Sequence, residues 1–125
     1  MRKRWRIKRG DYASAPAQRA AFRELLSSNG LQAKAPVCEL VYGELMTNAM
    51  KYGTEPMYVD VQIAPDSLRI KVDDSGGCFD LGQAMRKPPD QEGGRGLHIV
   101  KAIATKLTVE RTPRFNCEVT AVLKL

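Results

Sequence analysis

Residues 36–53 read PVCELVYGELMTNAMKYG, and this stretch does most to decide the fold of the chain. A proline in the first turn and a glycine after the last turn are typical of a helix, which we expect from about Pro36 to Tyr52, before Gly53. At 3.6 residues per turn, several apolar side chains fall on one side of this helix, which we expect to be buried. These side chains are Leu40, Val41, Leu45 and Tyr52.

Two polar residues, Glu44 and Asn48, lie one turn apart at the centre of this apolar side. Burying a carboxylate without a partner costs several kcal/mol, roughly, so the position calls for a cation, a metal or an open cleft. An amide oxygen suits Mg²⁺, and a carboxylate can orient or deprotonate a nucleophile. The pair therefore predicts a ligand cleft, and the alternative is that both residues brace neighbouring backbone.

Two glycine-containing segments further along the chain carry the next signals. Asp73-Asp74-Ser75-Gly76-Gly77 follows an alternating strand pattern, and glycines there allow a ligand to approach the backbone. Gly93-Gly94-Arg95-Gly96-Leu97 immediately precedes an apolar helix, whose free N–H groups and dipole favour an anion such as phosphate. An ordinary turn and a flexible hinge are the alternatives for the two segments.

The remaining pattern predicts one domain over residues 1–125. Strands are expected near residues 4–8, 57–64, 68–72, 106–111 and 117–125, and further helices near residues 14–29 and 97–104. Residues 73–94 show no sustained periodicity, which is typical of a functional lid or loop. Strands joined by tight turns favour an α+β fold, a two-layer sandwich of a mixed, mainly antiparallel sheet with helices on one face.

The net charge of +6 comes from one end of the chain. Residues 1–9 contain six basic side chains, whereas the other 116 residues hold 14 basic and 14 acidic ones. This distribution excludes a broad basic face and predicts that residues 1–9 form a basic edge strand or arm.

Composition also bears on the compartment. No window approaches about 18 consecutive apolar residues, so no membrane span is expected, and the basic N-terminus lacks the apolar run of a secretory signal. Cys38, Cys78 and Cys117 are odd in number and contain no C-x-x-C pair, so we expect neither a disulfide framework nor a zinc site. A reducing cytoplasm is the expected location.

Three segments together resemble the boxes of the GHKL ATPases, the superfamily of gyrase, Hsp90, histidine kinases and MutL. Glu44-Leu-Met-Thr-Asn48-Ala-Met-Lys-Tyr-Gly53 resembles the N box, Asp74-Ser-Gly76 the start of the D-x-G-x-G box, and Gly94-Arg-Gly96-Leu97 the second glycine box. The resemblance runs from about residue 13 to residue 125. It implies the Bergerat-type ATP-binding fold. The small single-domain form is most similar to bacterial anti-sigma factors that are also serine protein kinases.

The resemblance implies a role for each matching residue. Asn48 would ligate Mg²⁺, Glu44 would act as general base or orient the attacking hydroxyl, and Asp74 would accept the adenine amino group. Gly76 would let the base lie against the backbone, and residues 77–93 would form the ATP lid. The remaining nucleotide-binding residues would be Lys51, Gly94, Arg95, Gly96 and Leu97.

The implied function is an ATP-dependent serine/threonine protein kinase and anti-sigma regulatory factor. Its partners would be a sigma factor and an antagonist (anti-anti-sigma) protein, which it would phosphorylate. Direct nucleic-acid or membrane contact is not expected. Relatives commonly dimerise, and the edge strand could mediate a homodimer here.

Two departures from the family pattern keep an alternative open. Cys78 stands in place of the last glycine of D-x-G-x-G, and Asn116-Cys117-Glu118 stands where the family often has a Gly-Thr pair. The alternative is a nucleotide-binding or nucleotide-independent regulatory adaptor without kinase activity. A third hypothesis, nucleic-acid binding through residues 1–9, predicts a steep salt dependence.

Overall fold

The computed structural model describes residues 1–86, 95–114 and 117–125, with Arg95 described by its backbone alone. The strands are β1 (Arg2–Ile7), β2 (Met57–Ala64), β3 (Ser67–Asp74), β4 (Lys106–Glu110) and β5 (Cys117–Lys124). The α-helices are α1 (Ala15–Ser28), α2 (Ala35–Tyr52), α3 (Leu81–Arg86) and α4 (Arg95–Ile103).

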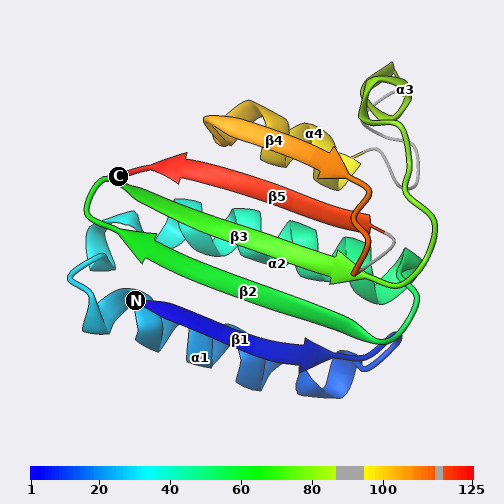
Figure 1. The fold of residues 1–125 in the computed structure, drawn as a ribbon. Helices are drawn as coiled ribbons and strands as arrows, with labels where there is room; N and C mark the ends of the chain where they lie inside the picture. The colour runs from blue at the N-terminus through cyan, green and yellow to red at the C-terminus, as the bar shows by residue number, and fades with distance from the viewer. Residues whose placement is uncertain (87–94, 115–116) are drawn as a thin grey trace.

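The five strands form one sheet in the order β1-β2-β3-β5-β4. Every neighbouring pair is antiparallel, so the sheet is antiparallel throughout rather than mixed. Helices α1, α2 and α4 lie on one side of it (Figure 1). The predicted α+β sandwich is therefore confirmed.

Alternation along the strands builds the core between the sheet and the helices. Val59, Val61, Ile70 and Ala121 are fully buried, whereas the intervening side chains point to the helix-free side of the sheet. Because neighbouring strands are in antiparallel register, these apolar residues form a continuous surface for α1, α2 and α4 to cover.

Helix α2 corrects the expected direction of burial. Leu40 and Tyr52, expected inside, are 44% and 46% exposed. The residues that are buried lie about one position, or roughly 100°, further around the helix. They are Cys38, Val41, Tyr42, Leu45, Met46, Ala49 and Met50.

The reason for this rotation is packing against α1 as well as the sheet. The rings of Phe22 and Tyr42 stack with centroids 4.2 Å apart, which turns this side of α2 inward. Glu44 and Asn48 are consequently half-buried at the edge of the buried surface instead of at its centre. Their partial exposure removes the burial penalty on which the sequence interpretation relied.

A short helix that the sequence pattern did not predict, α3, lies within the expected lid. The side chain of Asp80 accepts a hydrogen bond from the Gln83 N–H at 3.1 Å and thereby caps the first turn. An acidic residue followed three positions later by glutamine is a recognised helix start. Residues 87–93 of the expected lid lie outside the described residues.

The basic arm is an edge strand, as predicted, but part of its charge is neutralised by the sheet. Arg2 donates two hydrogen bonds to Asp60, and Arg4 donates to Asp73 at 2.9 Å. Both carboxylates are almost fully buried, with 2% and 1% of their surface exposed. Two of the six basic side chains therefore already have carboxylate partners within the sheet.

The same helix-free side of the sheet continues with further charges. Asp73 lies opposite Glu118 in the register of β3 and β5. Burial, followed by repulsion from Asp73, raises the pKa of Glu118, although Lys71 opposes the shift. Of these two acidic side chains, Asp73 is the more deeply buried, and Arg4 is the cation paired with it.

Replacing Arg4 by methionine is expected to destabilise the fold by about 2 kcal/mol, because it leaves Asp73 buried without its cation. This loss is smaller than for fully buried ion pairs, since the Arg4 side chain is 27% exposed. Urea unfolding measures the change. Arg6→Met is the matched control, since Arg6 is exposed and lies 3.8 Å from an exposed Glu55. Its expected cost is below about 1 kcal/mol, and equal losses in the two variants would contradict the assignment.

Both chain ends are attached to the hairpin of β2 and β3. The Ile63 N–H donates to the Met1 carbonyl at 2.8 Å, and the Leu125 N–H donates to the Asp66 carbonyl at 2.9 Å. Figure 1 shows the two ends at the same end of the sheet. None of the described helices is both long enough and apolar enough to cross a membrane.

Candidate functional site

A cavity of about 320 Å³ opens at the other end of the sheet. Its walls come from α2, the ends of β3 and β5, the segment from Gly77 to Ala84, and α4. Leu45, Val72, Phe79 and Val119 make much of the surface apolar, whereas Asn48 and Asp74 contribute polar atoms. An apolar cleft with a few fixed polar groups is the usual form of a small-molecule site.

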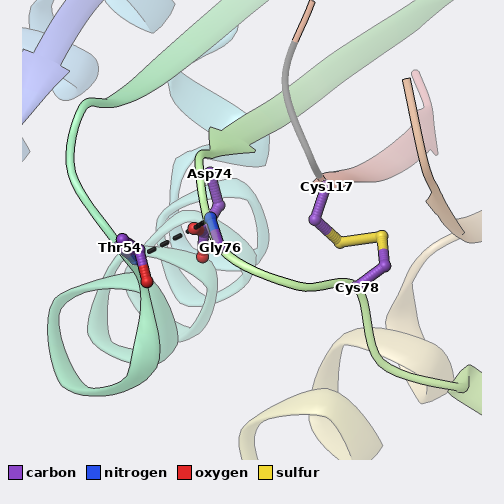
Figure 2. The surroundings of a disulfide bond; sticks show 5 residues. All are labelled: Thr54, Asp74, Gly76, Cys78 and Cys117. Atoms are coloured by element: carbon purple, nitrogen blue, oxygen red, sulfur yellow. Dashed lines mark hydrogen bonds between the residues drawn. A yellow bond between two sulfur atoms is a disulfide. The ribbon is translucent and has the colours of Figure 1, made fainter. Parts of the chain in front are cut away.

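Asp74 is held in place by one of its two carboxylate oxygens. Oδ1 accepts hydrogen bonds from the Thr54 N–H at 2.9 Å and the Gly76 N–H at 2.6 Å, as Figure 2 shows. Asp74 itself lines the cavity, so Oδ2 remains as the oxygen that can accept from a ligand. The carboxylate is thus oriented before any ligand binds.

Glu44 and Asn48 bring α2 to the start of α4. Asn48 lines the cavity one helical turn from Glu44. A Cβ at Gly96 would lie 2.8 Å from Glu44 Oε2, so the absence of a side chain at Gly96 makes room for this carboxylate. The predicted base and the predicted phosphate-binding helix are therefore neighbours.

The N-terminus of α4 is only partly described. Arg95 opens the helix, and Leu97 lines the cavity with 3% of its surface exposed. Gly94 and the side chain of Arg95 lie outside the described residues, so their phosphate contacts stay predictions. Lys51 is exposed in the last turn of α2 and is not among the residues that line the cavity; its role also stays a prediction.

The loop after α2 contributes a residue that the sequence interpretation missed. The Thr54 N–H binds Asp74, and its carbonyl accepts from the Ser75 N–H at 3.0 Å. Only the antiparallel arrangement of β2 and β3 places Thr54 beside Asp74, which follows it by 20 residues. The predicted end of the helix at Gly53 was the one local signal in this loop.

Replacing Gly53 by alanine is expected to destabilise the protein by about 2 kcal/mol, the usual scale for overpacking. An added Cβ would lie 2.6 Å from the Ala49 carbonyl oxygen, would overlap Met57 Sδ, and would lie 3.0 Å from Asp74 Oδ2. Thermal unfolding measures the loss. Gly43→Ala, in the middle of α2, is the control, because nothing lies within 4 Å of its Cβ position. It should stabilise the helix by up to about 1 kcal/mol.

The cysteines contradict the expectation from their spacing. Cys78 and Cys117 form a disulfide across 39 residues, with Cα atoms 4.8 Å apart (Figure 2), and Cys38 is a free, buried thiol. Spacing along the chain gave no sign of the pair, because the sheet brings it together. Cys117 begins β5 directly opposite Asp74, close to where the chain leaving β3 reaches Cys78.

The residues present suit Mg²⁺ bound together with a phosphorylated ligand. In the described part of the chain, no group of three His, Cys, Asp or Glu side chains could hold a metal ion. Mg²⁺ commonly binds through one or two protein ligands together with substrate phosphates. One amide oxygen at Asn48, near a helix start that favours phosphate, fits that mode rather than an all-protein metal site.

One known protein family matches most of the chain. The family described as the histidine kinase-like ATPase domain matches residues 9–122. No curated protein matched the sequence. The family match spans α1, α2, α4, the cavity and most of the sheet.

Proposed function

Since the chain belongs to the histidine kinase-like ATPase domain family, we propose that it binds ATP with Mg²⁺ and phosphorylates a serine or threonine of a partner protein. In this proposal it acts as an anti-sigma regulatory factor whose phosphorylation substrate is an anti-anti-sigma protein. The observation that carries the ATP-binding part is the single cavity that gathers Asn48, the oriented Asp74 and the start of α4, with Glu44 beside Gly96.

The adenine end of the site is the Asp74 side. Oδ2 accepts a hydrogen bond from the exocyclic amino group of adenine, which guanine replaces with a carbonyl oxygen. Leu45, Val72 and Phe79 supply apolar surface for the faces of the base. The two N–H donors on Oδ1 hold the carboxylate in place, and because a carboxylate only accepts, it cannot donate to the guanine carbonyl oxygen.

The phosphate end is the α4 side. The N–H groups of the first turn of α4 and its dipole favour the negative charge of the phosphates. Asn48 would hold Mg²⁺ through its amide oxygen. When bound, the ion neutralises charge on the phosphate oxygens, which is a large part of what phosphoryl transfer requires.

In this proposal Glu44 accepts the proton of the attacking hydroxyl. The serine oxygen attacks the γ-phosphorus as its proton passes to the Glu44 carboxylate. The bond from the γ-phosphorus to the bridging oxygen breaks, and ADP leaves with that oxygen. Gly96 matters because a side chain there would push the carboxylate away from this position.

The choice of a protein hydroxyl and of sigma-type partners comes from the resemblance of the three boxes to anti-sigma kinases. Two measurements test the proposal: calorimetry with Mg-ATP, and phosphate transfer to candidate antagonist proteins. We expect saturable ATP binding and a phosphoserine or phosphothreonine product. Absence of ATP binding would overturn the proposal. ATP binding together with capture of a sigma factor, but with no transfer to any antagonist tested, would favour the adaptor function.

A further inference from the structure

The two departures from the family pattern, Cys78 and Cys117, are bonded to each other in the wall of the cavity. Cys117 lines the cavity directly, and Cys78 lies between Gly77 and Phe79, which also line it. The disulfide therefore connects the segment that begins the expected lid with the first residue of β5 (Figure 2). Cys78 stands in place of the last glycine of D-x-G-x-G, and Cys117 lies where the family often has a Gly-Thr pair, so neither belongs to the pattern that the sequence resembles.

The bond closes a small loop around Asp74. Asp74 and Cys117 are register partners in β3 and β5. The chain leaves the sheet after Asp74, and four residues later Cys78 is bonded back to Cys117, beside the point of departure. The first half of the loop is fixed by the hydrogen bond from Gly76 to Asp74 and by the Ser75 hydroxyl, which donates to the Pro56 carbonyl at 2.8 Å.

The second half of the loop has a different attachment. Gly77 is exposed, and nothing lies within 4 Å of its Cβ position. Among the described residues, the next attachment to the sheet is the disulfide, before the cap of α3 at Asp80. Phe79, Asp80, Gln83 and Ala84, all on the cavity wall, follow directly. Leu81 of α3 packs against the hydrophobic core as well, so the bond is the covalent part of what positions this wall.

We propose that the Cys78–Cys117 disulfide is a positioning element of the nucleotide pocket and that the thiol redox state of this pair sets ATP affinity. The inference rests on the proposed ATP-binding function. With the bond closed, the wall is held in the conformation that forms the cavity. With the bond open, that conformation is one of several. The apparent ATP affinity is then the intrinsic affinity multiplied by the fraction of molecules that adopt it.

The chemistry is thiol–disulfide exchange with a dithiol reductant. One thiolate of the reductant attacks Cys78 Sγ, which is half-buried, and buried Cys117 leaves as a thiolate. The second thiol of the reductant then displaces Cys78 and closes the reductant's own disulfide. Two electrons and two protons pass to the protein, leaving two thiols. A disulfide oxidant such as oxidised glutathione reverses the reaction.

The test is the affinity for Mg-ATP, measured by equilibrium dialysis of the whole chain in oxidised and in reduced dithiothreitol. Thiol titration after denaturation verifies each state, because Cys38 gives one thiol with the bond closed and the three cysteines give three with it open. We expect reduction to weaken ATP binding about tenfold. This factor corresponds to a cavity wall that, without the disulfide, adopts the binding conformation about a tenth of the time.

Variants separate positioning from general stability. The double variant Cys78→Ser, Cys117→Ser should bind ATP with the weak, reduced-state affinity in both buffers, and Cys38→Ala should keep the full redox response. Circular dichroism establishes that each variant is folded. For a double variant that fails to fold, the comparison of the two redox states of the wild-type chain decides.

The outcomes distinguish the two proposals. Equal ATP affinity in the two verified redox states would overturn the inference and leave the proposed function intact. A fall in melting temperature on reduction without a change in affinity would also overturn it, since the bond would then act on stability alone. No ATP binding in either state would overturn the proposed function, and the inference with it.

Discussion

Glu44→Gln is expected to lower the rate of phosphoryl transfer by about a thousandfold while leaving ATP affinity within about twofold, the pattern of a group that acts in the transition state. The amide keeps the size of the side chain and its fit against Gly96, but it cannot accept the proton of the attacking hydroxyl. Glu44 lies on α2, outside the set of residues that line the cavity, so its replacement removes no direct contact with the nucleotide.

Single-turnover transfer from radiolabelled ATP, combined with calorimetry, measures the two quantities separately. Glu39→Gln is the matched control on the same helix, since Glu39 pairs with exposed Arg23 at 2.6 Å and should affect neither quantity. Transfer at the wild-type rate in Glu44→Gln would remove Glu44 from the mechanism. A large loss of ATP affinity would instead assign it to ligand binding.

Asp74→Asn is expected to weaken ATP binding by about a hundredfold, the loss of a hydrogen bond to a charged group together with a mismatched donor. Oδ1 accepts from two N–H groups, so the amide oxygen of asparagine has to occupy that position. Its NH₂ group then takes the place of Oδ2 and meets the adenine amino group donor to donor. Folding should be preserved, because both hydrogen bonds that fix the loop survive.

The same substitution should reduce discrimination between ATP and GTP, since the new donor can bind the guanine carbonyl oxygen. Competition binding with the two nucleotides measures this. Asp66→Asn, in the exposed turn between β2 and β3, is the control and should leave both affinities unchanged. Unchanged ATP binding in Asp74→Asn would place the adenine ring elsewhere in the cavity.

The strands were predictable because their signals are local. Alternation from Met57 to Ala64 gives the observed bounds of β2, and the Pro65-Asp66 turn leads into β3 as expected. The first turn of α1, which contains Pro16, and its end at Ser28, two residues before Gly30 with its φ of 71°, also follow from single residues. Such features need no knowledge of the rest of the chain.

The buried side of α2 and the disulfide were not predictable in this way. The rotation of α2 depends on Phe22, which meets Tyr42 only once α1 has packed. The Cys78–Cys117 bond depends on the register of β3 with β5. Glu44 and Asn48 were selected on an incorrect assumption about their burial. Their spacing on one helix was nevertheless enough to place Glu44 beside Gly96 of α4 and Asn48 on the cavity wall.

The location of the chain ends has a practical consequence for how the protein can be studied. Met1 and Leu125 are both held by the turn region of the β2–β3 hairpin, whereas Asp74 and Cys117 lie at the far end of strands of eight residues. That separation is about 25 Å at the usual rise per residue. A fluorescent protein fused to either end, or immobilisation on a sensor surface through it, should therefore leave the cavity open to solvent. Redox titrations of nucleotide affinity can then be followed on an anchored sample as the buffer is exchanged.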